Sequence, residues 1–161
     1  MSATPLSALP ADGDYSETLN AMHSGWDAAM GIRFVRATLD EIVVELSIGP
    51  AHLQAYGLVH GGVYTGLIEM ATSTGATLNA LGRGQLAVGL ENQTSFLHAT
   101  RAGKLRATAK PLARGQKTQV WEATVTDDNG RAVATGRVRL LSLDQGQPLA
   151  GESLGVAASK G

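Results

Sequence analysis

The residues best suited to chemistry lie in one stretch of the chain, from Gln54 to Ser73. It contains a histidine followed by two glycines, His60, Gly61 and Gly62, and then a single carboxylate, Glu69. Glycine has no Cβ, so a ligand can approach such a backbone closely. A helix that begins there offers free N–H groups to developing negative charge. The stretch therefore predicts a site with an oxyanion donor and a carboxylate base or nucleophile.

A long amphipathic helix, from about Gly62 to Leu81, is predicted to position Glu69, its only charged residue. Apolar residues recur on one helical face, at Val63, Leu67, Met70, Thr74, Leu78 and Leu81. A second face carries small residues around the carboxylate, namely Gly62, Thr65, Gly66, Ser73 and Ala76. Because carboxylates are rarely buried unless paired or used, this face is the candidate catalytic face.

The rest of the chain predicts an antiparallel sheet around that helix. A short helix is expected over Tyr15–Met30, ended by Gly31. Alternating apolar and polar residues predict strands at Ile32–Thr38, Ile42–Ile48, Leu86–Leu97, Gly103–Ala113, Lys117–Asp127 and Arg131–Leu143. Strands with one buried and one solvent-exposed face, together with one long helix, favour an α+β fold. In this arrangement of elements an antiparallel sheet wraps around one central helix.

Composition excludes several classes of function. The chain has 161 residues, enough for one domain with a core, and a net charge of -1 argues against a nucleic-acid or membrane-surface binder. It has no cysteine, so disulfides and thiolate chemistry are excluded. The histidines show no metal-ligand spacing. No apolar run approaches the ~20 residues that span a bilayer, and no secretory signal is apparent. A cytoplasmic location is expected.

These motifs together resemble a known family. His60-Gly61-Gly62 before a helix that carries Glu69, combined with Gln54, Gly57, Ser73, Asn92 and the segment Gly115–Trp121, is similar to hotdog-fold acyl-CoA thioesterases of the phenylacetate-pathway and 4-hydroxybenzoyl-CoA types. The resemblance covers roughly Trp26–Leu143. It implies a hotdog domain over 26–143, preceded by a leader and short helix (1–25) and followed by a disordered tail (144–161).

The resemblance also implies roles for individual residues. The Gly61 N–H would polarise the thioester carbonyl, Glu69 would act as base or nucleophile, and the Ser73 hydroxyl would help to place the attacking water. Thr72 stands next to Ser73, and a one-residue shift in register would exchange their roles. The other implied site residues are Gln54 and His60, which would line the same site, Asn92 as a brace, and Arg106, Thr118, Arg114 and Lys117 for the coenzyme A arm. No metal or cofactor is implied, because coenzyme A is part of the substrate.

Distance within the helix predicts how this site is assembled. The eight residues from Gly61 to Glu69 rise about 12 Å at ~1.5 Å each, whereas reacting groups must lie within about 3–3.5 Å of one carbonyl carbon. One helix therefore cannot supply both groups to one substrate. Two antiparallel copies can, if a two-fold axis passes near Thr65. The family likewise implies homodimers joined edge to edge, often paired again into tetramers.

Two other functions remain open from the sequence. A hotdog hydratase acting on enoyl-CoA would pair an aspartate with a histidine near the helix start, and there is no aspartate between Gln54 and Ser73. A non-catalytic acyl-CoA binder would not need Glu69 or Ser73. The acyl group is not determined, because Tyr56, Tyr64 and Trp26 could line its pocket or belong to the core.

Overall fold

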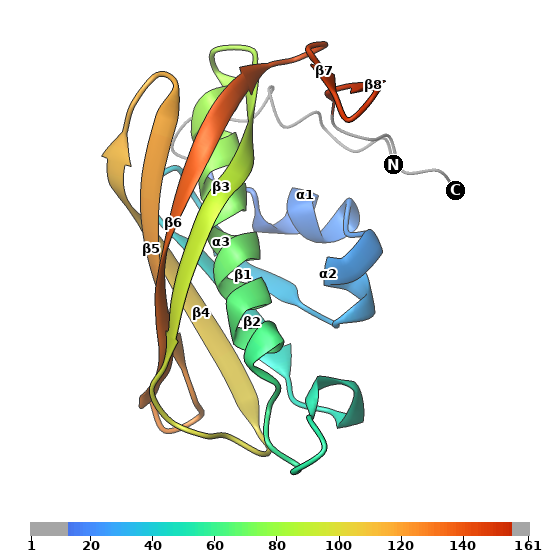
Figure 1. The fold of residues 1–161 in the computed structure, drawn as a ribbon, viewed down its shortest axis with the longest axis vertical. Coiled ribbons are helices and arrows are strands. Elements are labelled where there is room, and N and C mark those ends of the chain that lie inside the picture. Colours follow the sequence, from blue (N-terminus) through green and yellow to red (C-terminus); the bar gives the residue numbers. More distant parts are fainter. Residues whose placement is uncertain (1–12, 156–161) are drawn as a thin grey trace.

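The structure is a computed structural model that describes residues 13–155. One long helix, α3 (Gly61–Leu81), lies against a six-stranded antiparallel sheet (Figure 1). The strands are β1 (Arg33–Ala37), β2 (Ile42–Ser47), β3 (Gln85–Phe96), β4 (Lys104–Arg114), β5 (Thr118–Thr126) and β6 (Ala132–Asp144). The sheet order is β1-β2-β4-β5-β6-β3, so β1 and β3 are its edges. The predicted α+β architecture is confirmed.

The core lies between α3 and the inner face of the sheet, where apolar side chains of both are buried. The ring of Trp121 on β5 packs so closely on α3 that a Cβ at Gly75 would lie 2.4 Å from it. Beside it the buried Gln119 donates a hydrogen bond to the Ala76 carbonyl at 2.9 Å. Ala76 therefore faces the sheet and not the candidate catalytic face, because the helix turns that position inward.

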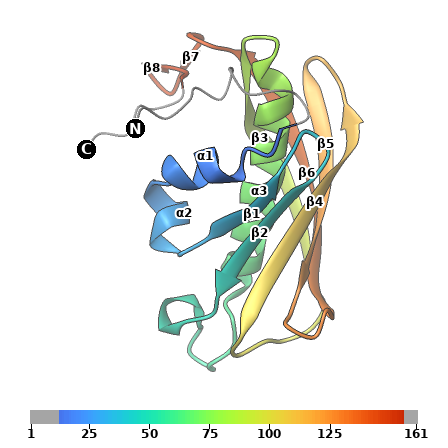
Figure 2. The same ribbon diagram turned by 180° about the vertical axis from the view of Figure 1, so that it is seen from behind.

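The N-terminal helix differs from the prediction. The segment forms two short helices, α1 (Ser16–Ala21) and α2 (Gly25–Ala29), which lie beside α3 (Figures 1 and 2). Gly25 has a φ of +63°, a left-handed value that a continuous helix cannot contain. The break brings α2 over α3, where Trp26 contacts Gly66.

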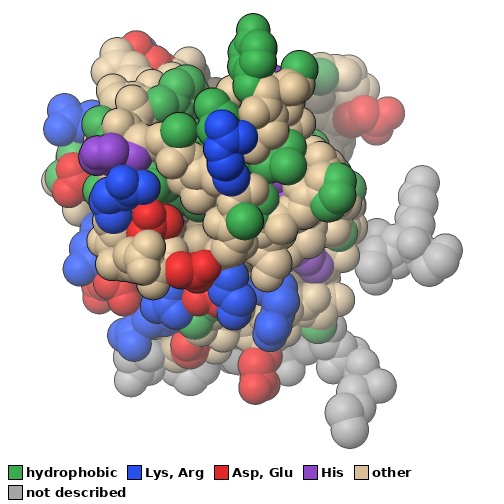
Figure 3. Space-filling view, turned by 90° about the horizontal axis from the view of Figure 1, so that it is seen from below, with side chains coloured by type: hydrophobic (Ala, Val, Ile, Leu, Met, Phe, Trp, Pro, Cys, Tyr) green, Lys and Arg blue, Asp and Glu red, His purple; other side chains and the backbone are tan. Residues whose placement is uncertain are grey.

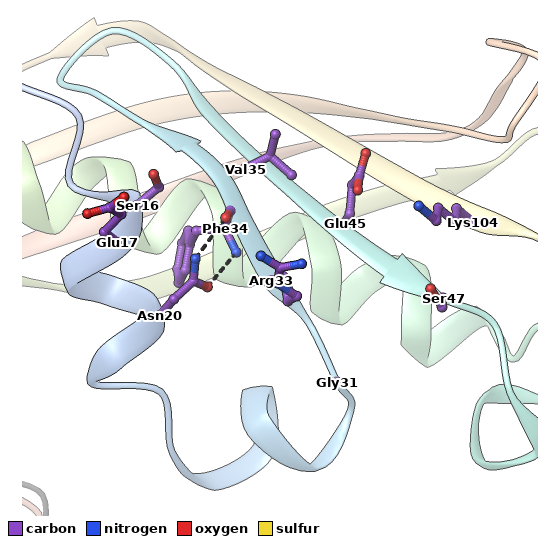
Figure 4. A pocket seen from close by; sticks show the side chains of 10 residues that line it. All are labelled: Ser16, Glu17, Asn20, Gly31, Arg33, Phe34, Val35, Glu45, Ser47 and Lys104. Atoms are coloured by element: carbon purple, nitrogen blue, oxygen red, sulfur yellow. Dashed lines mark hydrogen bonds between the residues drawn. The ribbon is translucent and has the colours of Figure 1, made fainter.

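The two edges of the sheet are not equivalent. The side chain of Asn20 on α1 donates to the Phe34 carbonyl and accepts from the Phe34 N–H, both at 2.9 Å (Figure 4). Asp14 accepts the Ala37 N–H at 3.0 Å, and the Ala37 carbonyl accepts the Tyr15 N–H at 2.7 Å. The edge of β1 is thus occupied by its own chain. No strand within 13–155 pairs with the outer edge of β3, which leaves that edge open to a second chain.

Burial raises the pKa of Asp14, but the donated N–H groups of Ser16 and Ala37 outweigh it and hold the pKa of this carboxyl below its ordinary value. Asp14 therefore stays ionised at neutral pH and keeps α1 on the β1 edge.

The chain after β6 is partly ordered. Two short strands, β7 (Pro148–Leu149) and β8 (Glu152–Ser153), form a small hairpin inside the segment that the sequence predicts to be disordered. Gly146 and Gly151 both have positive φ and permit its turns. The remainder of that tail, 156–161, and the leader 1–12 lie outside the described residues.

Candidate active site

The start of α3 leaves one particular N–H free. His60 is the N-cap, and its Nδ1 accepts the Gly62 N–H at 2.9 Å, while its carbonyl accepts the Val63 N–H at 2.9 Å. The Gly61 N–H has no hydrogen-bond partner among the described residues. Because His60 Nδ1 accepts this hydrogen bond, the N–H of the neutral imidazole is on Nε2. His60 therefore orients the backbone and leaves the Gly61 donor available.

The glycines at this position are required by neighbours in the chain itself. A Cβ at Gly61 would lie 2.8 Å from the Phe96 ring, and one at Gly62 would lie 2.9 Å from the His60 ring. The sequence predicts close approach of a ligand here, and the structure adds close approach of two side chains. Phe96 is half-exposed and covers the Gly61 backbone from β3.

Glu69 is held by hydrogen bonds at both carboxylate oxygens. The Ser73 hydroxyl donates to Oε1 and the Asn92 amide donates to Oε2, each at 2.9 Å. Asn92 is itself fixed, because its oxygen accepts the Thr94 hydroxyl at 2.7 Å. An ionised carboxylate is an acceptor only, so both contacts suit the charged form. The half-buried Glu69 is thus held in one orientation by Ser73 and Asn92, an arrangement in which a carboxylate can act as a base or nucleophile.

Ser73 and Thr72 have different roles. The hydroxyl of the buried Thr72 donates back to the Ile68 carbonyl at 2.8 Å, in the usual manner of helix threonines. Ser73 alone reaches the Glu69 carboxylate. In this chain the Ser73 hydroxyl positions Glu69.

A bulge in β3, which the regular strand predicted over Leu86–Leu97 does not include, makes room for the Glu69 carboxylate. The register shifts between Gly89 and Glu91, so Leu90 has no partner on β6. A Cβ at Gly89 would lie 2.5 Å from Glu69 Oε1. A glycine inside an alternating strand pattern is the sequence signal for such a bulge and close approach. Gly89 is therefore a positioning residue for Glu69.

Gly89→Ala is expected to lower kcat by about 10- to 100-fold with little effect on KM. The added methyl must displace the carboxylate, and a shift of about 1 Å at a reacting group can cost that much. Steady-state kinetics and a thermal melt measure the two effects. Gly82→Ala is the matched control, because that glycine has a φ of -61° and no atom within 4 Å of the added Cβ. Unchanged kcat in Gly89→Ala would show that the carboxylate does not need this position.

Gln54 lies near Gly61, at the start of α3, and not near Glu69. Both residues line a cavity of about 350 Å³ together with Tyr64 and Phe96. Figure 3 views the molecule from this end, where apolar side chains gather in the upper part of the view around one Lys or Arg, and most charged side chains lie along the left and lower sides. Within one protomer the predicted site is thus divided into two halves on one continuous helix, about 12 Å apart at ~1.5 Å per residue.

The small-residue face of α3 is less open than expected. A Cβ at Gly66 would lie 2.2 Å from the Trp26 ring, so Trp26 of α2 is seated on this glycine. The chain's own indole therefore covers Gly66 within the protomer. Gly62 and Thr65 remain uncovered by Trp26, and Trp26 itself is 47% exposed.

The residues predicted to hold coenzyme A lie apart from Glu69 within the protomer. Arg106 alternates with buried neighbours on β4, so it lies on the outer face of the sheet, where it donates to Glu45 at 2.7 Å. Arg114 is ion-paired with Asp40. Lys117 and Thr118, at the start of β5, are exposed, and no described residue pairs with their side chains. Of this set, Lys117 and Thr118 are the most available to a ligand.

A second cavity, of about 420 Å³, lies between α1 and the exposed ends of β1, β2 and β4 (Figure 4), but no predicted catalytic residue lines it. Among residues 13–155, no three His, Asp or Glu side chains are grouped closely enough to hold a metal ion. None of the described helices has the length and hydropathy that crossing a bilayer requires.

Comparison with known proteins gives consistent matches. The family model of the thioesterase superfamily matches residues 56–134. A protein of Mycobacterium tuberculosis named as a candidate esterase is 40% identical over 121 residues, which is 74% of this chain and 86% of that one. The 1,4-dihydroxy-2-naphthoyl-CoA hydrolase of Escherichia coli is 32% identical over 76% of this chain and 90% of its own length.

A solved structure agrees with the sequence matches. A thioesterase of Haemophilus influenzae superposes with a TM-score of 0.76 and 27% identity, over 80% of this chain and 90% of that chain. The matched region includes the cap at His60, the α3 helix and the β3 bulge, because the family model spans all three.

Proposed function

The chain belongs to the thioesterase superfamily, with the hotdog fold and the thioester hydrolysis of that family, and we propose that it hydrolyses an acyl-CoA thioester to the free acid and coenzyme A. The observation that carries this proposal is the free Gly61 N–H on the same helix as the Glu69 carboxylate, which accepts one hydrogen bond at each oxygen. One relative's name gives a CoA thioester as its substrate, which supports the same class here.

In the proposed reaction the Gly61 N–H donates to the thioester oxygen as negative charge develops there. Glu69 either takes a proton from the attacking water or attacks the carbonyl carbon to give an anhydride that water then cleaves. In both routes the C–S bond breaks and coenzyme A leaves as a thiolate. Ser73 and Asn92 keep the carboxylate in place throughout.

We propose that two protomers build each site. Among residues 13–155 the β3 edge is the one sheet edge left open, and Glu69 lies directly behind it, against Gly89. Joining two β3 edges antiparallel sets the two α3 helices antiparallel, which brings Glu69 of one protomer toward Gly61 of its partner. Each homodimer then has two sites, and pairing of dimers into a tetramer is compatible with this arrangement.

The exposed Lys117 and Thr118 are proposed to contact the phosphates of coenzyme A, with Arg114 nearby. Arg106 would have to release Glu45 to join them.

A panel of aromatic and aliphatic acyl-CoAs, read out by release of free thiol, tests the proposed activity. Thiol release is expected for at least one thioester, at a rate that depends on protein concentration. Binding of acyl-CoAs without any thiol release would identify a non-catalytic binder instead. Loss of enoyl-CoA absorbance without thiol release would identify a hydratase.

A further inference from the structure

His52 is a buried histidine to which the proposed reaction gives no role. Only 7% of the residue is exposed, and it ends the short 3₁₀ helix Pro50–His52 between β2 and α3. Its Nδ1 accepts the Gly49 N–H at 2.8 Å, and its Nε2 lies 3.0 Å from the Met30 carbonyl. A carbonyl only accepts, so Nε2 carries the proton and donates to Met30. The imidazole is therefore neutral, and both of its nitrogens are in use.

The two hydrogen bonds of the His52 ring differ in what they connect. Gly49 is three residues before His52, so the Nδ1 bond closes only the local turn at the end of β2. Met30 ends α2, 22 residues earlier, so the Nε2 bond joins segments that are far apart in the chain. The Met30 N–H in turn donates to the carbonyl of Trp26, whose ring is seated on Gly66. The Nε2 bond thus fixes the loop before α3 against the helix that already lies on α3.

The backbone of His52 carries this attachment to the oxyanion donor. Its carbonyl accepts the His60 N–H at 2.9 Å, and the adjacent Leu53 pairs with Val59 as an isolated antiparallel bridge. His60 is the N-cap of α3, and the next N–H along the chain is the free one of Gly61. A movement of His52 is therefore passed through one hydrogen bond and one residue to the donor that the thioester oxygen must meet.

We propose that His52 is a positioning residue, whose Nε2 hydrogen bond to Met30 holds the Gly61 N–H where the oxyanion develops. The inference rests on the proposed thioesterase function, and it assigns His52 no contact with the substrate. An oxyanion donor acts mainly in the transition state, so its displacement lowers kcat more than it changes KM. A shift of about 1 Å at such a group can cost about 10²-fold.

Asparagine and glutamine each reproduce one of the two hydrogen bonds. In His52→Asn the amide oxygen takes the place of Nδ1 and can still accept the Gly49 N–H, but the side chain is too short to reach Met30. In His52→Gln the NH₂ group takes the place of Nε2 and can still donate to the Met30 carbonyl, while the bond to Gly49 is lost. Each variant gives up one hydrogen bond, so a similar fall in melting temperature is expected for both.

The two variants should nevertheless differ in catalysis. We expect kcat of His52→Asn to be about 10- to 100-fold below that of the wild type, with KM within about 3-fold, and His52→Gln to retain at least about a third of the wild-type kcat. Thiol release from a hydrolysed acyl-CoA, measured well below both melting temperatures, gives these values. A kcat in His52→Gln no higher than in His52→Asn, or a loss in His52→Asn confined to KM, would overturn the inference.

A double-mutant cycle tests whether His52 acts through Gly61. Gly61→Pro removes the free N–H, so a residue that works only by placing this N–H has nothing left to place. Adding His52→Asn to Gly61→Pro should therefore lower the residual kcat by less than about 2-fold, although the same change costs at least about 10-fold in the wild type. A wild type that hydrolyses no thioester would refute the proposed function itself, whereas hydrolysis with fully additive losses would refute only the role of His52.

Discussion

Replacing Glu69 by glutamine is expected to reduce kcat by about 10²- to 10⁴-fold, the range that a positioned general base contributes. The amide has the size of the carboxylate but can neither take the proton of water nor attack the thioester. KM should change little, because the free Gly61 N–H and the cavity beside it are untouched. Thiol release under saturating acyl-CoA measures the loss.

Two structural contacts make Glu69→Gln the informative variant. Its amide oxygen can accept from Asn92 and its NH₂ group can donate to the Ser73 oxygen, so the present hydrogen-bond sites remain filled. Glu69→Ala should also lose most turnover, but it leaves both neighbours without their acceptor and is expected to lower the melting temperature as well. If Glu69→Gln retained wild-type kcat on every thioester that the protein hydrolyses, the assigned chemistry would be wrong.

Secondary structure could be predicted closely from sequence because each element has a strong local signal. The helix expected from Gly62 begins at Gly61 and ends at Leu81 as predicted. The six strands fall within one residue of their predicted limits at every end, since exposed and buried side chains alternate regularly along them. The break between α1 and α2 was missed because it depends on one backbone dihedral angle at Gly25.

The candidate site could be predicted only in part. Glu69, Ser73 and Asn92 meet as expected, and Gln54 lies with Gly61. The roles of Gly89 and Trp26 could not be inferred, because each depends on a contact between segments far apart in the chain. Such contacts follow from strand pairing and from the break after α1, and neither has a local pattern in the sequence. For the same reason, the ion pair that occupies Arg106 was not foreseen.

Mixing two inactive variants should restore about a quarter of wild-type activity if each site combines two protomers. Gly61→Pro removes the free N–H, and proline is accepted at the first position of a helix. His60 already has the extended conformation that proline requires of the preceding residue, with φ -65° and ψ 136°. Loss of one oxyanion donor costs about 10²- to 10³-fold, so this variant alone should be nearly inactive. Phe96→Ala controls for the ring that the new Cβ, 2.8 Å away, must displace.

When Gly61→Pro and Glu69→Gln are co-expressed in equal amounts, half of the dimers contain one chain of each variant. In a mixed dimer one site has both native groups and the other has neither, so roughly a quarter of all sites are intact for a two-fold symmetric pair. Differently tagged protomers allow the mixed dimers to be purified, and these should have about half of the wild-type activity. A site contained within one protomer gives the opposite outcome, since every chain in the mixture lacks one of the two groups. Inactive mixed dimers of normal size would therefore refute the two-protomer site, whereas recovered activity requires that Glu69 of one chain act on a thioester held by Gly61 of the other.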